Sequence, residues 1–308
     1  VKASNFTPFI PPSQPASTVE GSSAVTGVMT QPLWQFATGM TPSVYGVPGI
    51  LSGAALVFFA FIGFDVVATA SEETKNPHKN VPLGIGVGML LIIVMYMLVA
   101  VVTTGMVSYA DLAKQDSPSL ATAFELVGAD WAAKIISFGI VLGLATVVMV
   151  LLLGLTRIVF AMSRDGLLPR GLSKTGKHGT PAALQIVVGA VVALVAAFFD
   201  IGVLSDMVNI GTLSAFALVA ISIPIMRKKR PDLPRAFKMP GSPWIPILIA
   251  VANFWLMLNL SVLTWIRFVV WLVVGFAIYF GYGYWHARLG KGDLTETLSA
   301  ETDKAVNG

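Results

Sequence analysis

The sequence predicts an all-α integral membrane protein, and two observations support this fold class. Of the 308 residues, 55% are hydrophobic and only 12% are charged, about half the charged share of an ordinary soluble domain. A membrane-spanning helix needs roughly 20 mostly apolar residues. Seven segments meet that requirement, at about 50–72, 82–107, 131–162, 182–200, 204–226, 244–264 and 267–286.

Residues 1–48 precede the first apolar segment and are rich in proline, serine and threonine. The opening stretch, VKASNFTPFIPPSQPASTVEGSS, has too few large apolar residues for us to expect burial against a core. We therefore expect a loop outside the membrane. Residue 1 is valine, so a cleaved precursor and a fragment of a longer protein are both open. The odd number of spans favours the fragment.

The first apolar segment, 50–72, has an unusual middle. Gly63 disfavours a helix by about 1 kcal/mol relative to alanine, and Asp65 puts a carboxylate where burial in hydrocarbon is expensive. A helix broken near Ile62 and Gly63 explains both, because Asp65 can cap the half-helix that follows and transporters use such breaks to present carbonyls to a substrate. Two alternatives stay open. Gly63 could allow close packing of a neighbouring helix, and Asp65 could be a structural cap or an ion-pair partner.

The third apolar segment, 131–162, is longer than a membrane is thick, so we expect it to tilt or to project beyond the lipid. Arg157 lies in this segment, seven residues before Arg164, and Asp65 lies seven residues before Glu72. Both charges should therefore lie roughly 10 Å inside the same membrane boundary. Arg157 then either pairs with Asp65 or extends to the lipid headgroups.

The positive charges predict the orientation of the helices. If the link after the first span is cytoplasmic, alternation places four polar segments on that side: 73–81, 163–181, 227–243 and the tail 287–308. Fifteen of the 20 lysine and arginine residues lie there, and four lie on the opposite side. Because cytoplasmic loops carry the excess of positive charge, we expect the N-terminal segment and the link 108–130 to be extracellular.

The sequence offers no set of residues for an enzyme or a metal site. The chain contains no cysteine, its three histidines are scattered over links and helix ends, and no serine, histidine and acid occur together at membrane depth. We therefore predict no catalytic residue, no metal, no cofactor and no nucleic-acid partner. Membrane lipid is the expected surrounding of the apolar segments.

Four stretches resemble the second half of amino acid permeases in the amino acid–polyamine–organocation superfamily, most of all the bacterial relatives of cationic amino acid transporters. They are FFAFIGFDVVATASEETKNPHKNVPLGI, TRIVFAMSRDGLLP, VNIGTLSAF and RKKRPDLPRAFKMPG. Members of this family have twelve spanning helices, of which the first ten form two inverted repeats of five, with helices one and six broken. The resemblance implies that this chain holds helices six to twelve: the second repeat with its broken first helix, plus two extra C-terminal helices.

The resemblance also implies a substrate site, which falls on Phe59, Ala60, Ile62, Gly63 and Met149. The carbonyls of the first three would receive the α-ammonium group of an amino acid, and Phe59 would close over it as a gate. Met149 would line the site, and Asp65 matches the acidic position just beyond the break. The link 163–181 would be a cytoplasmic gate loop.

The expected function is secondary active transport of amino acids across the plasma membrane, with protons as the coupling ion by resemblance alone. The chain would be an incomplete C-terminal portion, and the missing N-terminal helices would complete its site. The alternative is a truncated membrane subunit with a structural or partner-binding role. The sequence does not identify the amino acid, because selectivity positions lie on the missing helices.

Overall fold

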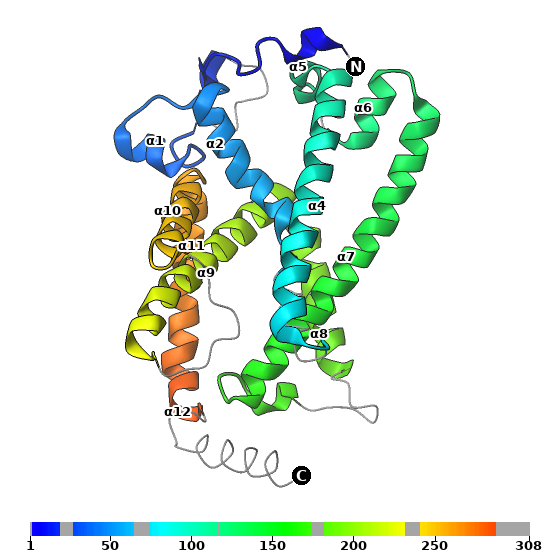
Figure 1. The fold of residues 1–308 in the computed structure, drawn as a ribbon. Helices are drawn as coiled ribbons and strands as arrows, with labels where there is room; N and C mark the ends of the chain where they lie inside the picture. The colour runs from blue at the N-terminus through cyan, green and yellow to red at the C-terminus, as the bar shows by residue number, and fades with distance from the viewer. Residues whose placement is uncertain are drawn as a thin grey trace. The chain divides into compact units, whose positions relative to one another are not determined.

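The computed structural model describes residues 2–18, 27–64, 74–115, 118–173, 182–231 and 241–287, and these residues are helical nearly throughout (Figure 1). The α-helices are α1 (Leu33–Thr38), α2 (Gly46–Val57), α4 (Pro77–Met106), α5 (Tyr109–Ala113), α6 (Leu120–Leu126), α7 (Asp130–Arg164), α8 (Ala182–Phe198), α9 (Ile201–Lys229), α10 (Trp244–Leu258), α11 (Val262–Ile278) and α12 (Tyr284–His286). Short 3₁₀ helices are η1 (Ala3–Phe6), η2 (Ala16–Thr18), η4 (Phe58–Phe61) and η6 (Arg170–Ser173), and η7 (Tyr279–Gly283) is a π-helix.

Within the described residues, four helices are long and apolar enough to cross a membrane: Lys79–Met106, Asp130–Arg164, Ile201–Lys229 and Val262–His286. Three apolar helices are shorter: Gly46–Phe61, Ala182–Phe198 and Trp244–Leu258. The large apolar side chains of α4 and α7 are mostly exposed, which suits contact with lipid rather than with water. The chain is therefore an all-α membrane protein.

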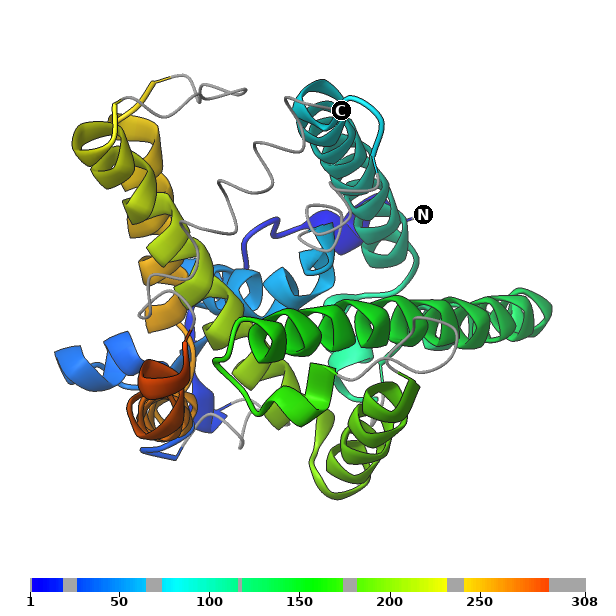
Figure 2. The ribbon, with the colours of Figure 1, turned by 90° about the horizontal axis from the view of Figure 1, so that it is seen from below.

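The chain divides into two compact units, which are described separately. The first unit contains residues 1–145 and 202–266, and the second contains 146–201 and 267–308. The centre of the first unit includes Ile210 and Leu213 of α9, both fully buried. Helix α10 packs against α2, and α9 and α10 lie side by side in two views (Figures 1 and 2).

Serine caps explain where three helices begin. The Ser108 hydroxyl accepts a hydrogen bond from the Asp111 amide at the start of α5, and the Ser119 hydroxyl does the same for Thr122 at the start of α6. Ser261 likewise caps the Thr264 amide, so α11 begins at Val262 rather than at the residue 267 expected from hydropathy. Each cap satisfies an amide that has no partner inside its helix.

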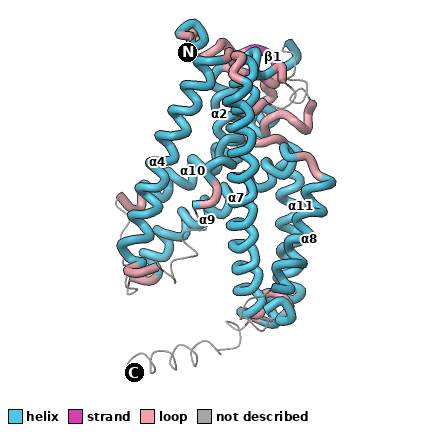
Figure 3. The backbone as a smooth tube through the Cα atoms, turned by 90° about the vertical axis from the view of Figure 1, so that its right-hand side faces the viewer, coloured by secondary structure: helices cyan, strands magenta, loops and turns pink. Residues whose placement is uncertain are grey.

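The N-terminal segment packs more closely than the sequence suggests. Ala16 and Gln35 are only 2% and 1% exposed, and β1 (Gln14–Pro15) pairs antiparallel with β2 (Ser43–Val44). Figure 3 shows this short strand pair beside the start of α2. The expectation that the opening stretch, residues 1–23, is not buried against a core is therefore wrong for Ala16. Hydrogen bonds hold this packing together: the Ala16 amide donates to the Pro42 carbonyl at 2.8 Å, and the Gln35 side-chain amide donates to the Ser43 hydroxyl at 3.3 Å.

The second unit holds the start of the link predicted as a gate loop. The buried Ser163 hydroxyl donates to the Pro169 carbonyl at 2.6 Å. Gly166 has φ +85°, and a side chain there would overlap the carbonyl oxygen of His286. This stretch therefore lies against the end of the C-terminal helix. Residues 174–181 lie outside the described residues, and the role as a gate stays a prediction.

Candidate functional site

The α2 helix ends within the apolar segment, at the residues that the sequence singles out. After the 3₁₀ turn of η4, Ile62 is extended, with φ −67° and ψ 136°. Gly63 follows with φ +127°, a conformation that residues with a side chain rarely adopt. The helix is therefore interrupted at Ile62 and Gly63, where the sequence predicts the break.

The conformation of Gly63 distinguishes between its two possible roles. Apart from its chain neighbours, no described residue has an atom within 4 Å of a Cβ built at this position. Among the described residues, close packing of a neighbouring helix therefore does not explain the glycine. The positive φ does explain it, because a left-handed conformation costs other residues roughly 1–2 kcal/mol.

Two helices of the first unit hold the carbonyls around the break. The hydroxyl of Tyr96, on α4, donates to the Ala60 carbonyl at 3.0 Å. The side-chain amide of Asn209, on α9, donates to the Leu56 carbonyl at 3.2 Å, and Asn209 is fully buried. Ala60 is one of the residues expected to bind a substrate. Its carbonyl can accept a second hydrogen bond, because a carbonyl oxygen has two lone pairs.

Aromatic rings pack on both sides of the interruption. The ring of Phe216, on α9, lies 6.1 Å from that of Phe58 before the break and 5.3 Å from that of Phe64 after it. The Tyr96 ring lies 5.1 Å from the Phe61 ring in an edge-to-face arrangement. Such pairs each contribute about 0.5–1.5 kcal/mol beyond burial. The interruption is therefore held between α4 and α9.

Phe59 differs from these neighbouring rings because it is 45% exposed. The Phe59 carbonyl accepts a hydrogen bond from the Ile62 amide at 3.2 Å, which closes the 3₁₀ turn. The backbone of this residue is thus fixed while its side chain remains accessible. This combination suits the predicted gate, although the gate itself stays a prediction.

For the other predicted residues, Met149, Asp65 and Arg157, the contacts between described residues show no link to the break. Asp65 lies outside the described residues. Met149 and Arg157 lie on the part of α7 that belongs to the second unit, and both are exposed, Met149 by 64%. The pairing of Asp65 with Arg157 and the lining role of Met149 stay predictions.

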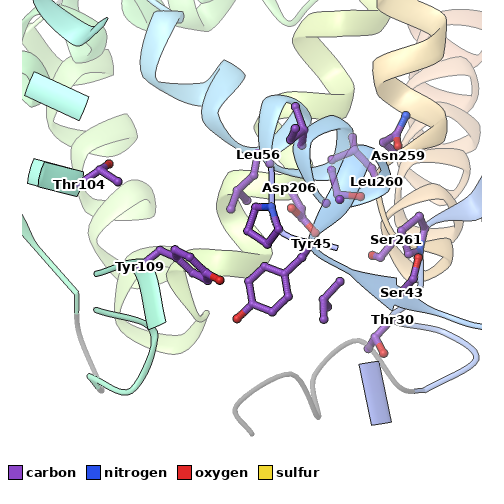
Figure 4. Close-up of a pocket in the computed structure, with 18 of the residues that line it drawn as sticks. Thr30, Ser43, Tyr45, Leu56, Thr104, Tyr109, Asp206, Asn259, Leu260 and Ser261 are labelled. Carbon is purple, nitrogen blue, oxygen red and sulfur yellow. The ribbon is translucent and has the colours of Figure 1, made fainter. Parts of the chain in front are cut away.

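A pocket of about 650 Å³ lies along α2 in the first unit (Figure 4). One face of α2 forms a wall, with Gly49, Ser52, Gly53 and Leu56 at helical spacing. The other lining residues are Phe9, Pro11, Thr30, Pro32, Ser43, Val44, Tyr45, Gly46, Ile50, Thr104, Tyr109, Asp206, Asn259, Leu260 and Ser261. Leu56 lies three residues before Phe59, so the pocket ends one turn before the predicted gate.

Sequence reasoning missed the three residues that hold the break. Asn209 and Phe216 both fall in VNIGTLSAF, which the sequence analysis used only to recognise a family. A buried asparagine in a membrane helix is itself a signal, because it must find a hydrogen-bond partner. Tyr96 lies in the apolar run IIVMYMLVA. Its hydroxyl group is the signal there, because a tyrosine hydroxyl in apolar surroundings needs a hydrogen-bond partner.

Replacing Tyr96 by phenylalanine is expected to loosen the break without disturbing α4. The variant keeps the ring but removes the hydroxyl that donates to Ala60, so the free energy of unfolding should fall by about 1 kcal/mol. Hydrogen exchange should become faster in the peptide covering residues 56–64. Mass spectrometry of the exchanged protein measures this directly.

Tyr284→Phe is the matched control, since Tyr284 is 59% exposed near the C-terminal end of the described helices. This substitution should leave exchange in 56–64 unchanged. Equal exchange in the Tyr96 variant and the unmodified protein would mean that the hydroxyl does not hold the break.

Comparison of the sequence with known proteins identifies the family of this chain. The sequence pattern of the family described as "Amino acid permease" matches residues 7–284. The chain is 47% identical over 247 residues to the branched-chain amino acid permease BcaP of Bacillus subtilis, a match covering 80% of this chain and 53% of that protein. It is 43% identical over 248 residues to the methylthioribose transporter of the same organism, with the same two shares.

A plant protein is also similar: cationic amino acid transporter 3, mitochondrial, of Arabidopsis thaliana is 44% identical over 195 residues, covering 63% of this chain and 31% of that protein. The chain thus spans about half the length of these two Bacillus subtilis relatives. The match to the family pattern covers nearly the whole sequence. The chain belongs to the amino acid permease family, within the amino acid–polyamine–organocation superfamily.

Proposed function

We propose that this chain forms the second half of a secondary active transporter that moves amino acids across the plasma membrane. The observation that carries the proposal is the interruption at Ile62 and Gly63 in an apolar helix of an amino acid permease. Irregular backbone at membrane depth is tolerated only where it is buried in protein or lines a cavity. Transporters use such interruptions to present carbonyls and helix ends to substrates.

In this proposal the carbonyls of Phe59, Ala60 and Ile62 receive the α-ammonium group of the substrate. The hydrogen bond from Tyr96 fixes the Ala60 carbonyl, so the ammonium group meets an oxygen that is already oriented. Phe59 covers the bound group and excludes water, and a cation–π contact would add about 1 kcal/mol. Met149 contributes to the lining from α7.

We further propose that α2, α4, α7, α8 and α9 correspond to helices six to ten of an inverted-repeat transporter. Helices α10 and α11 are then the two additional C-terminal helices. The N-terminal helices of the intact permease would complete the substrate site. A purely structural subunit is not proposed, because the relatives reported above are named as a permease and transporters.

The relatives' names differ in substrate, so the test must include several substrates. The intact permease should be reconstituted in liposomes and tested for uptake of labelled leucine, arginine and methylthioribose, with and without an inward proton gradient. We expect saturable uptake of an amino acid, increased by the gradient. Uptake of methylthioribose with none of either amino acid would overturn the proposal, and uptake indifferent to the gradient would remove proton coupling.

The orientation is a separate prediction, and the absence of cysteine from this chain makes it simple to test. Ser17 is exposed in the N-terminal segment, and a cysteine placed there should react with a membrane-impermeant thiol reagent on intact cells. A cysteine at Ser299, in the tail, should react only after the cells are opened. The reverse pattern would invert the proposed topology.

A further inference from the structure

The pocket along α2 contains a carboxylate that the proposed transport mechanism does not use. Asp206, near the start of α9, is half-buried and lies at the centre of the lining side chains in the view of Figure 4. The described residues that line the pocket include no lysine, arginine or histidine. The formal charge of the lining is therefore negative, and it comes from one residue.

A chain of hydroxyl groups orients this carboxylate. The fully buried Thr264 hydroxyl donates to an Asp206 oxygen, Oδ2, at 3.0 Å. The Ser261 and Thr264 hydroxyl oxygens lie 2.7 Å apart, and the Thr264 amide donates to the Ser261 hydroxyl. The Thr264 hydroxyl has one hydrogen, which it uses in the hydrogen bond to Asp206. In the bond between the two hydroxyls, Ser261 is therefore the donor and Thr264 the acceptor. All the donors thus point toward the carboxylate, which suits its charged form.

Asn259 provides a second acceptor in the same wall. Its side-chain nitrogen donates to the Trp255 carbonyl at 2.8 Å. Its side-chain oxygen is buried and accepts no hydrogen bond from the described residues, although the residue is only 4% exposed. A buried oxygen without a donor is unfavourable by about 1–3 kcal/mol. A ligand that carries hydrogen-bond donors would remove this deficit.

Two tyrosines form the opposite side of the pocket. The rings of Tyr45 and Tyr109 lie 5.4 Å apart in an edge-to-face arrangement. Tyr45 has φ +63° and ψ −173°, a conformation that costs a residue with a side chain about 1–3 kcal/mol and that often marks a functional position. Aromatic faces attract organic cations as well as apolar groups.

From these observations we propose that this pocket binds the ammonium group of a small organic cation, with Asp206 as its counter-charge. Asn259 accepts a further hydrogen bond, and the tyrosines contact the apolar part of the ligand. The pocket volume of about 650 Å³ is in the usual range for small-molecule sites. An amine or a basic side chain fits better than a zwitterion, since the described lining offers a carboxylate no cationic partner.

The test is equilibrium binding, which does not depend on whether the protein transports amino acids. n-Butylammonium is titrated into the purified intact protein in detergent, and binding is followed by saturation-transfer NMR. We expect saturable binding, weakened about tenfold or more by Asp206→Asn, because that variant removes the charge. Asparagine keeps an oxygen for the Thr264 hydroxyl, so the contact between α9 and α11 should survive.

Thr264→Val is the matched control: it removes the hydrogen bond to Asp206 but leaves the charge, and binding should remain within about threefold. n-Butanol, which has the same length and no charge, should not saturate. Equal affinity for n-butylammonium in Asp206→Asn and the unmodified protein would overturn the proposal. Loss of binding in Gly63→Leu alone would place the cation at the helix break instead.

If Asp206→Asn lowers the melting temperature markedly, a second variant is needed that does not change the carboxylate. Tyr109→Leu serves this purpose, because Tyr109 also lines the pocket. Loss of the aromatic face should weaken n-butylammonium binding about threefold, and unchanged affinity would contradict the site. Sodium should not displace n-butylammonium better than potassium does at constant ionic strength. A specific effect of sodium would mean that the pocket selects a metal ion rather than an organic cation.

Discussion

Replacing Gly63 by leucine in the intact permease should abolish uptake while leaving the protein inserted in the membrane. Gly63 has φ +127°, and a non-glycine residue in the left-handed region is unfavourable by roughly 1–2 kcal/mol. The chain would relieve this strain by changing the backbone at Ile62 and with it the direction of the substrate carbonyls. Uptake in proteoliposomes and the amount of protein in the membrane fraction measure the two parts of this prediction.

Gly86→Leu on α4 is the matched control, because Gly86 is an exposed helical residue and a Cβ there also meets nothing within 4 Å. It should preserve uptake. Gly63→Ala carries the same backbone strain with a smaller side chain and should therefore retain only a small part of the activity. Full uptake by Gly63→Leu would contradict the proposed role of the break.

Replacing Phe216 by alanine should have the second largest effect. The Phe216 ring contacts rings on both sides of the interruption, Phe58 and Phe64. Loss of two aromatic pairs removes about 1–3 kcal/mol, and the vacated space adds to this cost. We expect a melting temperature several degrees lower and a half-saturating substrate concentration at least several-fold higher, because the two segments would no longer be held in one geometry.

Two further variants show whether this effect is local. Phe216→Leu keeps most of the volume and should restore stability more than it restores substrate affinity. Phe138→Ala removes a ring that is 67% exposed on α7 and should change neither quantity much. If Phe216→Ala and Phe138→Ala behaved alike, Phe216 would be an ordinary apolar residue rather than a positioning residue.

Composition and the lengths of the apolar segments were sufficient to predict the helical class, and two single residues predicted a break in the first apolar segment. Gly63 and Asp65 are expensive in an apolar helix, and the backbone leaves the helical conformation at Ile62 and Gly63. The bounds of α10 and α11 were harder to predict, because only the three residues Asn259, Leu260 and Ser261 separate the two apolar helices. The spacing of Ser261 and Thr264 is the local signal that marks the start of α11.

The contacts that hold the break could not be predicted, because they join residues far apart in the sequence. The bonds from Tyr96 to Ala60 and from Asn209 to Leu56 span 36 and 153 residues. No helical or strand period links such positions. The pocket at Asp206 has the same origin, since its walls come from six separate segments of the chain. The sequence alone can show that a residue such as Gly63 is unusual, but only the folded structure shows which distant residues contact its neighbourhood.

The central claim is that the interrupted α2 helix binds the α-ammonium group of an amino acid. The most direct measurement is competition against uptake of labelled leucine by the intact permease in liposomes. Unlabelled leucine, N-acetyl-leucine and 4-methylpentanoate have the same side chain, but only leucine has the free ammonium group. We predict that leucine competes fully and that the other two compounds compete at least about a hundredfold more weakly, because carbonyls would then face no cation. Equal competition by N-acetyl-leucine would contradict the claim.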